Sequence, residues 1–103
     1  MMDEKDLYEG VLAHYGVPNQ IAVAVEECSE VQHELCRLLR KDRPMDGYLL
    51  DHLAEEIADV RIAMEQMEMA FELERKVTFW RNQKLRRAAA KLEKDRKEEV
   101  ESR

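Results

Sequence analysis

A scarcity of helix breakers constrains the fold of this chain more than any other feature of its sequence. Its 103 residues include only 3 Gly and 2 Pro, and neither type occurs after Gly47. The chain is 45% hydrophobic and 39% charged, a balance typical of long amphipathic helices. With turn formers nearly absent, the sequence predicts an all-α fold, and 103 residues suffice for one domain rather than two.

Helix-terminating residues and apolar periodicity place the first two helices. The first helix is predicted over residues 3–15 and ends at Gly16. The second is predicted over residues 18–41, because Pro18 suits a first helical position and Arg43-Pro44 disfavours continuation.

Two further helices follow. Asp46 is the expected N-cap of the third helix, which reaches about Phe71. The apolar phase slips beyond that point, so a turn or kink is expected within residues 71–75. A basic fourth helix is predicted over about residues 74–97, and the polar tail that follows is expected to fray.

The second and third helices repeat each other. A shift of 29 positions superposes Glu26–Val31 on Glu55–Val60. Their apolar positions coincide under the same shift, with Ala24, Cys28, Val31, Leu35 and Leu38 matching Leu53, Ile57, Val60, Met64 and Met67. Spacings of three and four residues form the seam of closely packed antiparallel helices. Residues 18–71 are therefore expected to form an antiparallel hairpin with pseudo-twofold symmetry.

Two acidic pairs occupy matching positions of this hairpin. The pairs are Glu27 with Glu30 and Glu56 with Asp59. At ~100° per residue, the first member of each pair lies about 70° from the centre of its seam and the second about 130°. Four carboxylates on facing helices repel one another unless cations neutralise them, and hard oxygen ligands select Mg²⁺ or Mn²⁺. These acids therefore form a candidate metal site, for which a solvated acidic face is the alternative.

Charge is distributed unevenly along the chain. Residues 1–74 carry 6 Lys/Arg and 18 Asp/Glu, a balance of −12, whereas residues 75–103 carry 11 and 5, a balance of +6. A general nucleic-acid binder is basic overall, so the acidic body argues against that class. The distribution fits a site where carboxylates hold metal while cations meet phosphates. The alternative is attraction between the two halves or to a partner subunit.

The pattern Glu26-Glu27-x-x-Glu30, followed after 25 residues by Glu56-x-x-Asp59, resembles the signature of the MazG-like all-alpha nucleoside triphosphate pyrophosphohydrolases. The resemblance covers most of the chain. It implies a four-helix bundle completed by oligomerisation into a homodimer or homotetramer, with Mg²⁺ or Mn²⁺ on the four acids. The implied reaction cleaves a ribo- or deoxyribonucleoside triphosphate to the monophosphate and pyrophosphate.

A second stretch, Asn82-x-Lys84-Leu85 with Arg86-Arg87, is similar to the Asn-x-Lys-Phe-x-Arg-Arg sequence of the same family. The resemblance implies that Asn82, Lys84 and Arg87 contact the substrate's phosphates. Leu85 stands where the family usually has Phe, and three alanines follow the arginines. For the basic residues, the alternative is a solvated helix face.

The remaining site residues lie on the hairpin. Glu26 or Glu55 would be the general base, and the sequence does not decide between them. Gln20 lies two turns before Glu27 on its face. It is either a contact to the nucleotide's base or sugar or an ordinary first-turn residue. His52 has no acidic or cysteine partner at ligand spacing and is interpreted as a surface or interface residue.

Two rival functions stay open. Phosphoribosyl-ATP pyrophosphatase shares the helical bundle, and a non-catalytic helical interaction module would use the acidic face to bind a basic partner. The fourth helix also carries apolar residues that need cover, namely Leu73, Val77, Trp80, Leu85 and Leu92. A single short chain has little left to cover them, which favours an oligomer.

Three observations bear on the compartment. No apolar run approaches the ~18 residues of a membrane span, and the acidic start is unlike a signal peptide. Cys28 and Cys36 would lie about 12 Å apart on one helix, which is too far for a disulfide. The sequence therefore predicts a reduced cytoplasmic protein without membrane or nucleic-acid partners.

Overall fold

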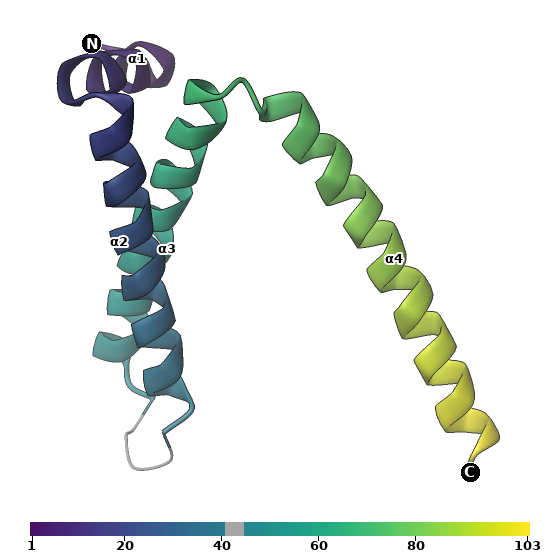
Figure 1. Cartoon of the computed structure of the whole chain (residues 1–103). Coiled ribbons are helices and arrows are strands. Elements are labelled where there is room, and N and C mark those ends of the chain that lie inside the picture. Colours follow the sequence, from purple (N-terminus) through teal and green to yellow (C-terminus); the bar gives the residue numbers. More distant parts are fainter. Residues whose placement is uncertain (41–44) are drawn as a thin grey trace. The chain divides into compact units, whose positions relative to one another are not determined.

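A computed structural model describes residues 1–40 and 45–103, and within these ranges the chain forms four α-helices and no β-strand (Figure 1). The predicted all-α class is therefore confirmed. The predicted end of the second helix at Lys41 and the break at Arg43-Pro44 lie outside the described residues. None of the described helices is both long enough and apolar enough to cross a membrane.

Helix α1 (Glu4–Tyr15) ends at Gly16, as the sequence predicts, and Asp3 is its N-cap. The Asp3 carboxylate accepts a hydrogen bond from the backbone N–H of Asp6 at 2.8 Å, which satisfies an open donor of the first turn. Gly16 has a φ of +89°, which a residue without a side chain adopts at little cost. Helix α2 (Val17–Leu38) follows it directly and ends three residues before the predicted Lys41.

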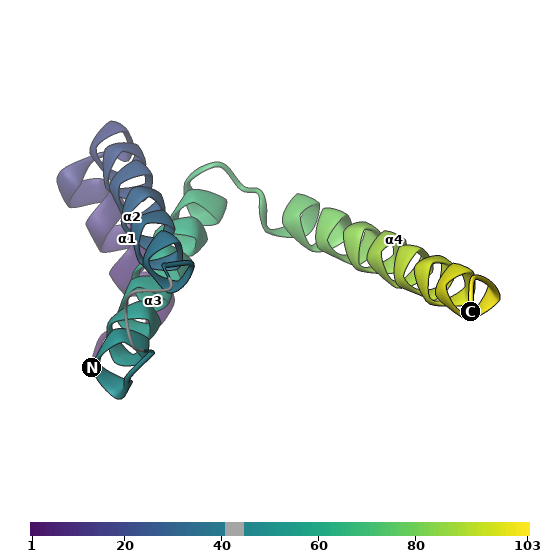
Figure 2. The same ribbon diagram turned by 90° about the horizontal axis from the view of Figure 1, so that it is seen from below.

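Helix α3 (Gly47–Ala70) runs antiparallel to α2, and together they form the hairpin (Figures 1 and 2). The predicted N-cap is confirmed, because Asp46 accepts a hydrogen bond from the N–H of Leu49 at 2.9 Å. The helix ends at Phe71, and Glu72 takes a left-handed φ of +53°. The predicted turn after α3 is therefore present, although no glycine marks it in the sequence.

Tyr8 fastens α1 to the hairpin. Its side chain is buried, and its hydroxyl donates a hydrogen bond to the carboxylate of Glu65 on α3. That hydrogen bond, together with burial, raises the pKa of Tyr8 well above its ordinary value. The short helix therefore packs against the end of the hairpin where α2 begins and α3 ends.

The chain divides into two compact units, Met1–Phe71 and Glu72–Arg103, and the second contains helix α4 (Glu74–Glu101). The tail expected to fray is helical to Glu101. No glycine or proline interrupts it, and ion pairs between residues four apart, such as Lys91–Asp95 at 2.9 Å, support the helix.

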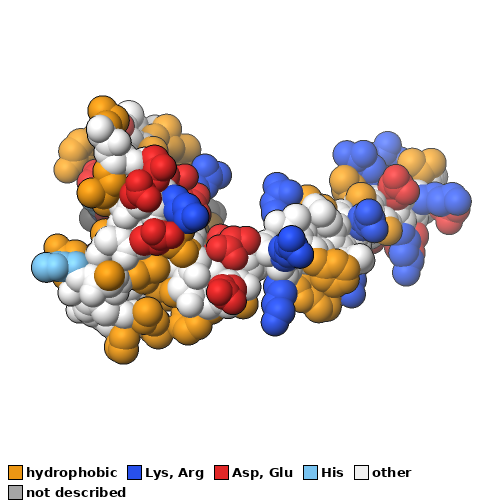
Figure 3. Space-filling view, turned by 90° about the horizontal axis from the view of Figure 1, so that it is seen from above, with side chains coloured by type: hydrophobic (Ala, Val, Ile, Leu, Met, Phe, Trp, Pro, Cys, Tyr) orange, Lys and Arg blue, Asp and Glu red, His pale blue; other side chains and the backbone are white. Residues whose placement is uncertain are grey.

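Helix α4 carries an exposed apolar face framed by basic side chains (Figure 3). No residue of this helix is buried, and Trp80 is 50% exposed. The apolar face is lined by Leu73, Val77, Trp80 and Leu85, with Lys76, Arg81 and Lys84 beside it. The apolar surplus that the sequence analysis identifies is therefore on the surface of this chain.

The contact between α2 and α3 differs from the predicted seam. Two seam residues, Leu35 and Met64, are exposed at 47% and 38%. The buried positions include polar side chains instead, and they are Gln20, Ala24 and Glu34 on α2 with Leu49, Glu56, Ala63 and Gln66 on α3. The apolar seams therefore cover each other only in part, because Ala24 is buried and the remaining seam residues are half-buried. The charged side chains Glu34 and Glu56 are thus among the buried positions of the interface.

An apolar groove runs along the hairpin. The hairpin groove is lined by Ile21, Ala24, Val25, Cys28, Ser29, Gln32, Met64 and Met67. Val25 within it is 61% exposed. The first unit therefore has an uncovered apolar surface of its own, in addition to the apolar face of α4.

Candidate metal centre

The four predicted metal ligands meet inside the hairpin. Glu27 and Glu30 are three residues apart on α2, and Glu56 and Asp59 are three residues apart on α3. One carboxylate oxygen from each residue lies within 4.8 Å of the other three. The acid cluster, as we name these four residues, therefore brings together the side chains that the sequence repeat singles out.

Three polar layers cross the hairpin at seven-residue intervals. Gln20 on α2 faces Gln66 on α3, and moving seven residues forward along α2 corresponds to moving seven residues backward along α3. The next facing pairs are therefore Glu27 with Asp59 and Glu34 with His52. The first pair forms a buried amide hydrogen bond of 2.9 Å. The acid cluster is thus the middle layer, with the hydrogen-bonded Gln20–Gln66 pair on one side and the Glu34–His52 ion pair on the other.

Burial makes the acid cluster unfavourable without a cation. Glu56 is only 8% exposed, and Glu27 is half-buried. Burial raises the pKa of Glu27, and the charges of Glu30 and Asp59 raise it further. Burial likewise raises the pKa of Glu56, with hydrogen bonding to Glu30 and the charge of Asp59 adding to the effect.

Two oxygens of the acid cluster have unmet hydrogen-bonding capacity. Oε2 of Glu27 and Oε2 of Glu56 are buried, and within the described part of the chain neither has a hydrogen-bond partner. A buried carboxylate oxygen without a donor is costly, so a bound cation would remove the penalty. The donor set is all carboxylate oxygen, which is the chemistry that Mg²⁺ and Mn²⁺ prefer.

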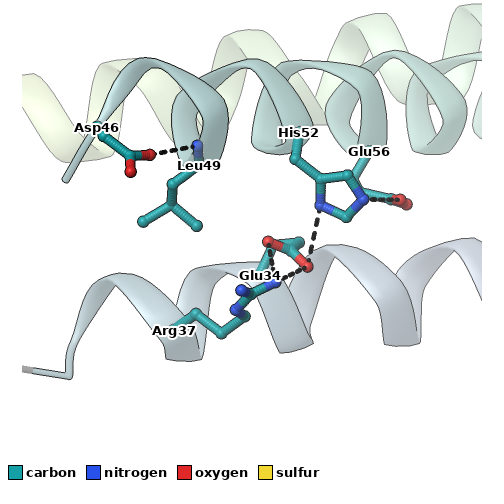
Figure 4. A network of polar contacts seen from close by, with 6 residues as sticks. All are labelled: Glu34, Arg37, Asp46, Leu49, His52 and Glu56. Carbon is teal, nitrogen blue, oxygen red and sulfur yellow. Dashed lines mark hydrogen bonds and ion pairs between the residues drawn. The ribbon is translucent and has the colours of Figure 1, made fainter. Parts of the chain in front are cut away.

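An ion-pair network adjoins the acid cluster (Figure 4). Glu34 is 3% exposed and accepts a hydrogen bond from Arg37 at 3.1 Å, while Nδ1 of His52 lies 3.1 Å from the same carboxylate oxygen. Nε2 of His52 lies 3.8 Å from Oε1 of Glu56. His52 is therefore not the partnerless residue that the sequence analysis describes, because its acidic partners come from α2 as well as α3.

Glu34 and His52 each stabilise the charged form of the other. Burial alone would raise the pKa of Glu34, but the contacts with His52 and Arg37 outweigh it and hold the pKa below its ordinary value. The Glu34 carboxylate in turn raises the pKa of His52, against the opposing effect of burial. A cavity beside this network opens onto the acid cluster and is lined by Ser29, Glu30, His33, Glu34, His52 and Glu56.

The predicted general bases, Glu26 and Glu55, are exposed next to the ligands on their own helices. Gln20 is 7% exposed and donates its hydrogen bond to Gln66, so its side chain serves the hairpin interface. About 10 Å of helix separates it from Glu27 at 1.5 Å per residue. Its contact with a nucleotide stays a prediction.

The predicted phosphate contacts Asn82, Lys84 and Arg87 all lie on α4 and are exposed. Glu34 belongs to the surroundings of the site but lies outside the motifs found in the sequence. Its spacing of seven residues from Glu27 was a signal available in the sequence, since positions seven apart share a helix face.

Comparison with models of known protein families, with curated proteins and with solved structures finds no match to this chain. The site is therefore defined by its own geometry, and the MazG-like resemblance rests on the motif residues alone.

Proposed function

We propose that this protein is a magnesium-dependent nucleotide pyrophosphohydrolase that cleaves a nucleoside triphosphate to the monophosphate and pyrophosphate. The observation that carries the proposal is the acid cluster, in which four carboxylates converge within 4.8 Å across two helices. Its buried, unpartnered oxygens on Glu27 and Glu56 fit a hard divalent cation. The MazG-like spacing of the same acids supports the reaction type.

Each group has a proposed role in the reaction. Mg²⁺ on the acid cluster would activate water and stabilise negative charge on the attacked phosphate. Glu26 or Glu55, each next to a ligand, would accept the proton of the attacking water. Asn82, Lys84 and Arg87 would hold the departing pyrophosphate by charge-assisted hydrogen bonds.

Oligomerisation belongs to the same proposal. The hairpin groove and the apolar face of α4 are both exposed in the single chain. Their burial in a homodimer or homotetramer would complete a MazG-like bundle. The acidic first unit and the basic first half of α4 would also attract each other between copies.

The test is a panel of ribo- and deoxyribonucleoside triphosphates with Mg²⁺, with the products identified as monophosphate and pyrophosphate. Glu56→Gln keeps the side-chain shape but removes a ligand charge, and we expect a loss in kcat on the order of 100-fold or more. Gln substitutions at Glu26 and at Glu55 would show which one acts as the base. Phosphate chains left intact across the panel would instead favour the non-catalytic interaction module.

A further inference from the structure

Glu34 is a buried charge that lies outside the acid cluster. It is the least exposed residue of the network, at 3%. Arg37 donates to its two oxygens at 3.1 and 3.4 Å, and Nδ1 of His52 lies 3.1 Å from Oε1. Burying a carboxylate carries a desolvation cost, which well-placed hydrogen bonds offset. The carboxylate of Glu34 is therefore hydrogen-bonded by Arg37 and lies in ion-pair contact with His52.

His52 lies between Glu34 and the acid cluster. Its ring spans the space between two carboxylates, with Nδ1 at Glu34 and Nε2 at 3.8 Å from Oε1 of Glu56 (Figure 4). Glu34 lies on α2, whereas His52 and Glu56 lie one turn apart on α3. The imidazole of His52 thus lies between the Glu56 carboxylate and a carboxylate of the opposite helix.

We infer that Glu34 and His52 are positioning residues that hold Glu56 in the orientation required to bind the divalent cation, an inference that rests on the proposed metal site. Neither residue belongs to the acid cluster, and they act through Glu56. Outer partners that orient a metal ligand typically change metal affinity by about 10-fold to 100-fold when removed. The buried, unpartnered Oε2 of Glu56 is the oxygen that this arrangement leaves for the cation.

A purely structural role makes a different prediction. If Glu34 and His52 only joined α2 to α3, their removal would lower the stability of the hairpin and leave the folded protein's metal affinity unchanged. Metal affinity of the folded protein therefore separates the two roles, whereas melting temperature does not.

The experiment measures Mn²⁺ binding by electron paramagnetic resonance of the free ion, on the full chain, without any nucleotide. His52→Ala and Glu34→Gln should each bind Mn²⁺ about 10-fold to 100-fold more weakly than the parent. The double variant should be no weaker than the weaker single variant, because both act through one contact. His14→Ala, an exposed histidine on α1, is the matched control and should bind like the parent.

Two further substitutions resolve the geometry and provide folded alternatives to His52→Ala. In His52→Gln an amide occupies the position of Nε2 beside Glu56, so this variant should recover most of the lost affinity. His52→Asn keeps an amide only at the position of Nδ1 beside Glu34 and should not. Circular dichroism confirms that each variant compared is helical.

The outcomes distinguish this inference from the proposed function. Strong Mn²⁺ binding by the parent with unchanged binding by His52→Ala and Glu34→Gln would overturn the positioning role and leave the metal site standing. Equal affinities for His52→Gln and His52→Asn would also overturn it. Absence of Mn²⁺ binding by the parent would overturn the metal site itself, and the positioning role with it.

Discussion

At Glu56, burial disfavours the charged form of the carboxylate. The carboxylate is 8% exposed, beside Glu30 and Asp59, and its pKa is raised by that burial and by those neighbours. Glu56→Gln removes the buried charge and keeps the side-chain volume. We expect this variant to melt at a higher temperature than the parent in the absence of metal, and to lose the rise in melting temperature that Mg²⁺ produces.

The control for this substitution is Glu68→Gln, on the same helix but outside the acid cluster. It should leave both the metal-free melting temperature and the Mg²⁺ response close to those of the parent. If Glu56→Gln destabilised the metal-free protein and still responded to Mg²⁺, the acid cluster would not be under electrostatic strain.

The raised pKa values at Glu27, Glu56 and His52 predict the direction of the pH dependence. Above the ordinary Glu pKa of 4.5 and up to the raised values, the folded protein holds more protons than the unfolded chain. Stability therefore falls as pH rises through that window. His52 acts in the same direction above its ordinary pKa of 6.5. The lowered pKa of Glu34 has the opposite effect, but only below 4.5.

We therefore expect the melting temperature of the metal-free protein to fall as the pH rises from about 5 to about 8, because the folded protein binds more protons than the unfolded chain over this range. Saturating Mg²⁺ should reduce or reverse that trend, because the metal binds the deprotonated carboxylates. Thermal melts in matched buffers measure both series. A metal-free melting temperature that rises over this range would contradict the pKa assignments.

At the scale of the elements, the hairpin is held in register by polar pairs rather than by an apolar seam alone. Gln20 and Gln66 are 7% and 8% exposed and form a 2.9 Å hydrogen bond. Gln20→Leu leaves the amide of Gln66 buried without its partner, which costs about 1–3 kcal/mol. Replacing both residues by Leu should restore most of that loss. Urea unfolding of the two single variants and the double variant measures the difference.

This series also tests the role predicted for Gln20 in substrate binding. If Gln20 contacts only the nucleotide, Gln20→Leu would raise KM and leave the free energy of unfolding unchanged. A double variant as destabilised as the single variants would show that the hydrogen bond is not the cause.

Helix boundaries were predictable because their signals are local. Gly16 and Asp46 end or begin helices through their own backbone or side chain, and the structure has both at the expected places. The convergence of the four acids followed from the 29-residue repeat, since equivalent faces of antiparallel helices meet. The turn at Glu72 was visible only as a slip in apolar phase, because a non-glycine residue adopts the left-handed conformation there.

The burial of polar residues between α2 and α3 was not predictable from apolar periodicity. The apolar and polar residues both recur at helical spacing, and contacts between the helices decide which set faces inward. His52 shows the same limit, because its partner Glu34 is distant in sequence and no local pattern links them. Pairing across helices is a tertiary property, whereas spacing along one helix is a local one.

At the scale of the whole molecule, exposed apolar surface predicts self-association. The hairpin groove includes Val25 at 61% exposure, and α4 exposes Trp80 at 50%. We expect light scattering at micromolar concentration to give at least twice the chain mass of 12.2 kDa. Val25→Glu places a charge in the groove and should shift the protein toward the monomer. A folded parent that remained monomeric would contradict the proposed oligomer.

Divalent-metal binding by the acid cluster is tested most directly by melting the parent protein in Mg²⁺, in Ca²⁺ and in NaCl of matched ionic strength. A cation that binds only the folded form stabilises it by mass action, by about 2.7 kcal/mol at 100 times its dissociation constant. We predict clear rises in melting temperature with both divalent ions, turnover with Mg²⁺ but not with the more loosely coordinated Ca²⁺, and little change with NaCl. Equal shifts in all three salts would contradict the metal site, because screening of a solvated acidic face would then suffice.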